Sequence, residues 1–245
     1  MKARPILFKP DMVNAILEGR KTMTRRIVKP LAGAGWRPET ANGDTLRLGM
    51  ITSPHPKKGK FGLFMRREIH PGSGKYEHDL VPCPYGAPGD VLWVRETWTH
   101  EAESVEACRA SFEDQMGGNT CGPYYLATES APETLRWKPS IHMPRWASRI
   151  TLEITDVRVE RLQDISEADA DSECFGGDFP GAVLPELFPG EPERWSHLSI
   201  PECFACLWES INGPGSWDAN PWVWVVEFQP HHMNVDAFLR GREVA

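Results

Sequence analysis

The chain has 245 residues, of which 40% are hydrophobic and 25% charged, a composition that excludes a disordered or fibrous protein. Its net charge of −7 argues against a protein that coats nucleic acid non-specifically, although it leaves room for a local basic site. The 10 Trp, 22 Pro and 21 Gly residues exclude a long helical bundle and favour a loop-rich fold with an indole core.

The amino-terminal stretch MKARPILFKP contains no apolar run long enough for a signal peptide, and no later segment approaches the roughly 18 apolar residues that span a membrane. We therefore expect a cytoplasmic protein with no membrane partner. The six cysteines are irregularly spaced, which is typical of free thiols in a reducing compartment.

The first elements are a short strand at residues 5–8 and a helix at 11–18. Asp11 suits the N-cap of this helix, and Gly19 can supply a left-handed stop. The segment GRKTMTRR, residues 19–26, follows at the helix carboxyl end, where cations also suit the helix dipole. A charged helix end is thus one interpretation of this segment.

Residues 31–82 are rich in Gly, Pro and Lys and contain strand-like runs at 45–51 and 60–66, which predicts an insertion or a peripheral hairpin. A turn at Pro88-Gly89-Asp90 then leads into a predicted strand at 91–98. Residues 99–123 are polar and irregular, and no element is assigned to them.

A proline-punctuated loop at 137–149 leads into a predicted pair of strands, 150–155 and 157–162. Ser166 then suits the N-cap of a short helix ending at Glu173, with an acidic first turn that favours the dipole. Further on we expect a loop at 175–201, a helix at 201–211, a strand at 222–228 and a loose tail at 231–245. These elements predict a mixed α+β fold around a compact antiparallel β-barrel with short flanking helices and large loop insertions.

Two groups of residues resemble metal sites, but neither has the spacing of one. The pair Cys203 and Cys206 has no partner pair at zinc-ribbon distance and lies among apolar residues of a predicted helix. His55, His70 and His78 are irregularly spaced before Cys83. The sequence therefore predicts no metal and no cofactor.

A candidate catalytic site combines Lys21, Thr22 and Thr24 with the acidic residues of 167–173. A lysine can act as a base, a hydroxyl as a nucleophile and a carboxylic acid as a proton donor. Such an arrangement requires the turn after Gly19 to persist through Lys21, because residues 21 and 24 of a regular strand face opposite sides. A solvated acidic helix face is the alternative interpretation of 167–173.

Four blocks of the sequence resemble a known family. They are AILEGRKTMTRR at 15–26, PGDVLWVRETW at 88–98, WKPSIHMPRWASRITLEITDVRVERLQDISEADADSE at 137–173 and LWESINGPGSWDANPWVWVVEF at 207–228. They are similar to the ASCH domains of the PUA-like superfamily, in the larger form found in bacteriophages and prophages. The resemblance implies a single PUA-like domain at 1–230 with an insertion at about 31–82, in the cytoplasm of a bacterial host.

Around its key motifs the chain resembles a small bacterial ASCH amidohydrolase that removes the acetyl group from N4-acetylcytidine. The motif Gly-Arg-Lys-Thr-x-Thr of that enzyme matches residues 19–24, which implies that Lys21 is the base and Thr24 the nucleophile. Its motif Glu-x-x-Ala-x-x-Glu matches residues 167–173, which implies that Glu173 is the acid. The implied substrate is an N-acylated pyrimidine nucleoside or base, and the mechanism needs no cofactor.

The matching blocks also contain residues that suit contacts with a nucleoside or nucleic acid. These predicted substrate-binding residues are Arg25, Arg26, Trp93, Arg95, Trp98, His142 and Arg145. Structural ion pairs and a tryptophan core are their alternative roles. Two other functions remain open: a non-catalytic reader of RNA or modified bases, and a phage accessory protein that acts on a host factor.

Overall fold

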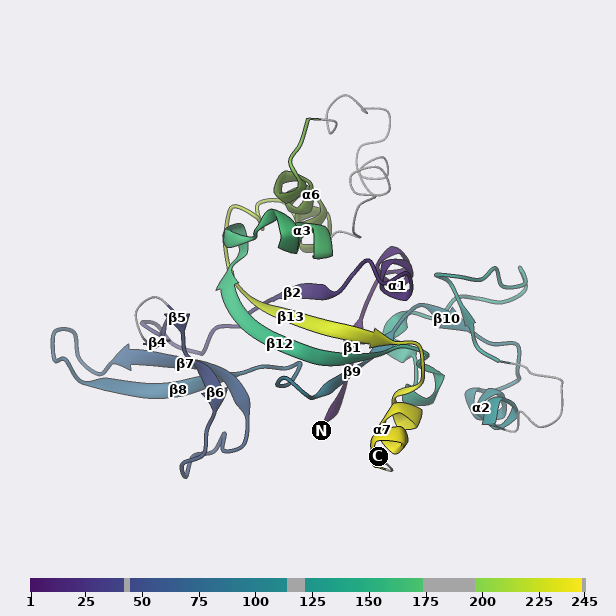
Figure 1. Ribbon diagram of the computed structural model, residues 1–245, viewed down its shortest axis with the longest axis horizontal. Helices are drawn as coiled ribbons and strands as arrows, with labels where there is room; N and C mark the ends of the chain where they lie inside the picture. The colour runs from purple at the N-terminus through teal and green to yellow at the C-terminus, as the bar shows by residue number, and fades with distance from the viewer. Residues whose placement is uncertain (42–44, 114–121, 174–196, 244–245) are drawn as a thin grey trace. The chain divides into compact units, whose positions relative to one another are not determined.

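The computed structural model describes residues 1–41, 45–113, 122–173 and 197–243 (Figure 1). These residues form two compact units. Unit 1 comprises Met1–Thr22, Asp90–Glu153 and Phe228–Ala245, and unit 2 comprises Met23–Gly89 and Ile154–Glu227. The predicted insertion therefore belongs to unit 2, together with β2 and most of two long strands.

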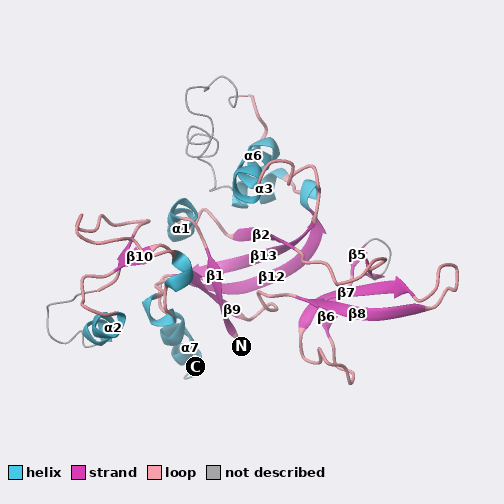
Figure 2. Ribbon diagram, turned by 180° about the vertical axis from the view of Figure 1, so that it is seen from behind, coloured by secondary structure: helices cyan, strands magenta, loops and turns pink. Residues whose placement is uncertain are grey.

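Strands dominate the structure, and helices flank them, so the predicted mixed α+β class is confirmed (Figure 2). The main sheet has the order β1-β9-β12-β13-β2, formed by Ala3–Leu7, Val91–Arg95, Thr151–Arg161, Trp222–His231 and Met23–Ile27. β1 runs parallel to β9, whereas β9 with β12 and β13 with β2 are antiparallel. The strand order is open among the described residues and includes a parallel pair, so the predicted closed antiparallel barrel is not confirmed.

In unit 1, helix α1 (Pro10–Leu17) begins one residue earlier than expected. Lys9 is its N-cap without a side-chain hydrogen bond, whereas Asp11, the predicted cap, lies in the first turn. Gly19 has the expected positive φ of 76°. The backbone N–H groups of Arg20 and Lys21 both donate to the carbonyl of Ala15, at 2.9 and 3.0 Å. The turn therefore persists through Lys21, as the chemical interpretation of this segment requires.

The carboxyl-terminal segment of unit 1 is not a loose tail. Helix α7 (Val235–Glu243) buries Val235 and Phe238 in a cluster with Val91 and Trp93 of β9. The Asn234 side chain accepts the Asp236 N–H at the start of this helix. The apolar residues of α7 are too few to predict a helix from the sequence. Packing against β9 buries them and stabilises the helix.

Unit 1 also contains several short elements. They are β10 (Trp98–Thr99), α2 (Val105–Glu113), β11 (Tyr124–Tyr125), and the 3-10 helices η1 (Ser140–His142) and η2 (Arg145–Ala147). β10 pairs with β11 in an antiparallel ladder. Part of the segment to which the sequence assigned no element is therefore ordered.

In unit 2, the predicted strand pair is one continuous strand, β12. Its buried positions change from Leu152 and Ile154 to Val157 and Val159, which is the pattern that one extra residue produces in a strand. No glycine or proline lies between the two halves, so the chain continues as one strand where the alternation of apolar residues suggested a turn.

After β12 the chain forms η3 (Leu162–Asp164), α3 (Glu167–Glu173) and α6 (Ile200–Asn212). The hydroxyl of Ser166 accepts the Asp169 N–H at 3.1 Å, which confirms the predicted N-cap. A capping box of Ser199 and Glu202 begins α6. The two helices pack against each other, and α3 packs beside β2 (Figures 1 and 2).

The segment at 31–82 forms a second sheet, so a hairpin in this region is confirmed. Its strands are β3 (Arg37–Pro38), β6 (Leu48–Met50), β7 (Phe61–Glu68) and β8 (Tyr76–Pro82), and β4 (Thr40–Ala41) pairs separately with β5 (Thr45–Leu46). β7 and β8 approach closely at Gly62, where a Cβ would lie 2.1 Å from the Val81 carbonyl oxygen. Only glycine fits at that position.

Candidate active site

Strand β2 carries the second half of the GRKTMTRR segment and is buried over its first three residues. It pairs with β13, with Thr24 opposite Val226 and Arg25 opposite Val225. Because successive side chains of a strand point to opposite faces, Thr24 and Arg26 leave β2 on one face and Arg25 on the other. The two faces of β2 therefore present different chemistry.

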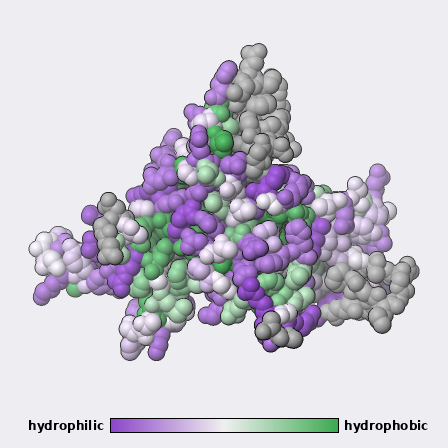
Figure 3. All heavy atoms as spheres, in the orientation of Figure 1, coloured by the Kyte–Doolittle hydropathy of each residue, from purple (hydrophilic) through white to green (hydrophobic). Residues whose placement is uncertain are grey.

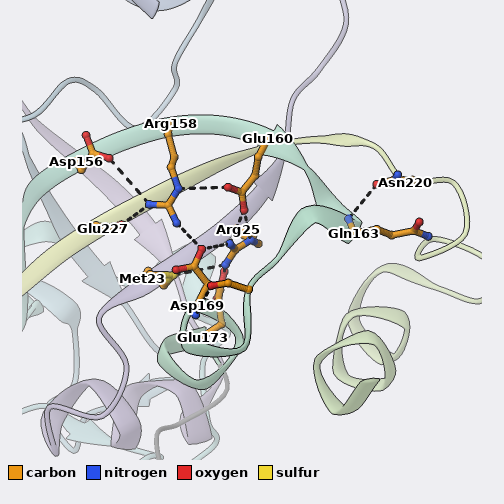
Figure 4. Close-up of polar contacts among 11 residues, drawn as sticks. Met23, Arg25, Asp156, Arg158, Glu160, Gln163, Asp169, Glu173, Asn220 and Glu227 are labelled. Carbon is orange, nitrogen blue, oxygen red and sulfur yellow. Dashed lines mark hydrogen bonds and ion pairs between the residues drawn. The ribbon is translucent and has the colours of Figure 1, made fainter. Parts of the chain in front are cut away.

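The Arg25 face is a network of ion pairs (Figure 4). The Arg25 side chain has 0% of its surface exposed. Its Nη2 donates to Asp169 Oδ2 at 2.7 Å, and its Nε donates to Glu160 Oε1 at 3.1 Å. Glu173 Oε1 lies 3.7 Å from Nη1. One buried guanidinium thus gathers carboxylates from β12 and α3.

A second arginine, Arg158 of β12, completes this network. It donates to Asp169 and Glu160 and also forms an ion pair with Glu227 of β13. Burial alone would raise the pKa of Asp169, but hydrogen bonds and charge from Arg25 and Arg158 outweigh it and hold that pKa below its ordinary value. Asp169 is therefore a stable anion at neutral pH.

Local sequence patterns explain why these groups meet. On β12, Val157 and Val159 are buried while Arg158 and Glu160 lie on the other, partly solvated face. In α3, Asp169 and Glu173 are four residues apart and so share one side of the helix. Glu167 is exposed, so the acidic segment is divided between a solvated face and a face directed at Arg25.

The other face of β2 carries Thr24 and Arg26. Thr24 is 2% exposed, and Arg26 on the same face is half-buried. Burial raises the pKa of the Tyr85 phenol, and the positive charge of Arg26 partly offsets this rise, which indicates that the two side chains are near each other. Tyr85 was not among the predicted site residues, because it lies in the irregular Cys-Pro-Tyr-Gly turn before β9.

The three predicted catalytic residues are all buried, at 1% exposure for Lys21, 2% for Thr24 and 5% for Glu173. Thr24 and Glu173 belong to unit 2, and Lys21 lies near the end of the first segment of unit 1. The structure brings Glu173 to Arg25, the neighbour of Thr24 in the chain. The role of each residue remains a prediction.

The predicted substrate-binding residues other than Arg25 and Arg26 lie in unit 1 and have various surroundings. Trp93 packs in the core with α7, and Trp98 packs with Tyr125 and neighbouring apolar residues. Both indoles therefore have the core role that was the alternative for them.

The other three predicted substrate-binding residues of unit 1 differ in how far they are exposed. Arg95 donates to the Met143 carbonyl at 3.0 Å and stacks on Trp93. Arg145 forms an ion pair with Asp236 at 2.7 Å. His142 is exposed on η1. Of these three residues, His142 is exposed, whereas Arg95 and Arg145 are half-buried.

The Arg25 network gives a prediction about stability. We expect Arg25→Met to lower the free energy of unfolding by about 3–5 kcal/mol, because it removes the buried cation and leaves Arg158 to balance Asp169 and Glu160, with Glu173 still buried. Urea unfolding followed by tryptophan fluorescence measures this change. Arg26→Met, on the same strand but half-buried, is the matched control and should change stability much less. Equal losses of stability in both variants would contradict the role of Arg25 as the central cation of the ion-pair network.

Comparisons of the chain with protein-family models, curated proteins and solved structures give no match. Among the described residues, no three His, Cys, Asp or Glu side chains are grouped so that they could hold a metal ion. No helix in the described part of the chain is long and apolar enough to cross a membrane.

Proposed function

We propose that the protein is an amidohydrolase that removes an acyl group from an N-acylated pyrimidine, with N4-acetylcytidine as the reference substrate. The observation that carries the proposal is the burial of Lys21, Thr24 and Glu173. Burying polar and ionisable side chains costs free energy, so a fold that buries all three types required for amide hydrolysis favours a functional role for them.

In the proposed reaction, the Thr24 hydroxyl attacks the acyl carbonyl carbon while Lys21 accepts its proton. The tetrahedral intermediate then breaks its bond to the exocyclic nitrogen, and Glu173 gives a proton to the departing amine. Glu173 lies on the Arg25 face of β2 and Thr24 on the other face, so the proposal requires the substrate to reach both faces around β2, which ends the strand order of the main sheet. Water hydrolyses the resulting threonine ester, releases the carboxylic acid and restores the hydroxyl. Arg26, on the Thr24 side of β2, is the proposed contact to the base, with Tyr85 near it as a second candidate.

Incubation of the purified protein with N4-acetylcytidine, followed by chromatography of released cytidine, tests the proposal. We expect release by the wild type and a loss of at least ~100-fold in Lys21→Ala, the lower end for removal of a general base. Lys21→Met keeps the apolar stem of the side chain and separates loss of the amine from loss of packing. No release by the wild type from the nucleoside or from acetylated oligonucleotides would overturn the proposal.

A further inference from the structure

The sheet at residues 37–82 has two arginines and a histidine in a row on one face of three strands. Arg37 of β3 lies directly opposite Arg66 of β7, and Arg66 lies opposite His78 of β8. Residues that are directly opposite on paired strands point to the same face. Arg37, Arg66 and His78 are all exposed, so this row faces solvent.

The pairing of Arg37 with Arg66 is unfavourable by itself. Like charges directly opposite each other destabilise a sheet. Neither guanidinium forms an ion pair with any residue of the described part of the chain, which is notable in a protein of net charge −7. Two neighbouring arginines without carboxylate partners form a site for an anion, because each guanidinium presents several fixed N–H donors.

An aromatic ring lies beside these cations. Tyr76 of β8 is 45% exposed, and the Arg66 guanidinium stacks 5.2 Å from its ring centroid. A surface cavity of about 470 Å³ has Arg37, Arg66 and Tyr76 in its lining. This volume lies within the range of sites that hold a nucleotide-sized ligand. We call Arg37, Arg66 and Tyr76 the arginine face.

The other charged groups near the cavity are already engaged. Arg67 forms an ion pair with Glu77 and stacks on Trp36. Glu68 accepts the Gly74 N–H at 2.7 Å and so closes the hairpin loop. Glu68 keeps its negative charge, so the cavity lining has three arginines and one carboxylate and is net positive. Figure 3 shows hydrophilic residues gathered over the outer half of this hairpin.

We propose that the arginine face binds single-stranded nucleic acid, with Arg37 and Arg66 on a phosphodiester and a base stacked at Tyr76. Arginine suits phosphate, and an exposed aromatic ring beside it suits the flat face of a base. A single strand fits better than a duplex because its bases are free to stack on a side chain. An acidic peptide would form ion pairs with the two arginines but would not need an aromatic ring for stacking.

Fluorescence anisotropy of the full chain with labelled oligouridylate, oligothymidylate and duplex DNA of about 12 nucleotides per strand tests this inference. We expect the wild type to bind both single strands, with a slope of log K against log salt of about −1.4 for two phosphate contacts. The double variant Arg37→Ala/Arg66→Ala should lose at least about 10-fold in affinity, and the slope should approach zero.

The matched control is Lys58→Ala/Lys60→Ala, which removes two exposed cations from the same unit without touching the arginine face. It should bind nearly as the wild type does. Tyr76→Leu should weaken binding by about 5-fold or more through lost stacking, and Tyr76→Phe should not. Thermal melting of each variant checks that the fold is intact, as expected for exposed side chains.

Absence of wild-type binding, or equal losses in the arginine and lysine variants, would overturn the inference. Duplex binding as tight as single-strand binding would overturn the assignment to single strands, and a preference between the two single strands would identify RNA or DNA. The inference does not depend on the proposed hydrolysis, since Thr24→Val should bind oligonucleotides as the wild type does. Hydrolysis without oligonucleotide binding would therefore refute only this inference. Oligonucleotide binding without hydrolysis would refute only the proposed function.

Discussion

Thr24→Val should lower the release of cytidine from N4-acetylcytidine by roughly 10³-fold or more, because it removes the nucleophile and leaves no covalent route. Valine has nearly the shape of threonine, so the buried site beside Val226 stays filled. The measurement is kcat/KM from initial rates, together with the midpoint of urea unfolding to verify the fold. Thr24→Ser keeps a hydroxyl and should retain part of the activity.

Thr22→Val is the matched control for this substitution. Thr22 also belongs to the GRKTMTRR segment, but it precedes β2 and is half-buried. It should leave kcat/KM close to the wild-type value. If both variants lost activity equally, the loss would reflect disturbance of the segment, and Thr24 would not be the nucleophile.

Glu173→Gln should lower kcat by about 100-fold or more, because glutamine cannot protonate the departing amine. Its shape is that of glutamate, so the packing of α3 beside β2 should be retained. Turnover at the wild-type rate in Glu173→Gln would exclude the role.

Glu173 also lies 3.7 Å from the Arg25 guanidinium, so an indirect effect through Arg25 needs its own control. Asp169→Asn provides it, since Asp169 hydrogen-bonds the same guanidinium at 2.7 Å and comes from the same helix. We expect Asp169→Asn to lower stability while retaining most of the turnover. Equal loss of turnover in the two variants would make Glu173 a residue that positions Arg25 rather than the acid.

Several elements could be predicted from the sequence because short-range interactions determine them. Gly19 ends α1 through a local left-handed conformation, and Ser166 begins α3 through a hydrogen bond to a residue three positions later. The apolar run of β13 and the pattern of α6 are equally local signals. The continued turn through Lys21 was a condition of the chemical interpretation, and the structure meets it.

The errors came from features that local pattern does not encode. The break at Asp156 was a change of alternation inside one strand, and no turn residue marked it as an ending. The segment after His231 lacked a strong apolar stripe, and its helix is stabilised by burying Val235 and Phe238 against β9, more than 130 residues earlier in the chain.

For the candidate site, the sequence alone determined which side-chain types occur in the segments 19–26 and 167–173, and it determined the helix turn that places Asp169 and Glu173 on one side. Tertiary structure decided that this side faces Arg25, whose partner Asp169 is 144 residues away in the chain. It also placed Arg37 opposite Arg66. Ion pairs and strand register depend on which segments meet in space, and no local propensity specifies that choice.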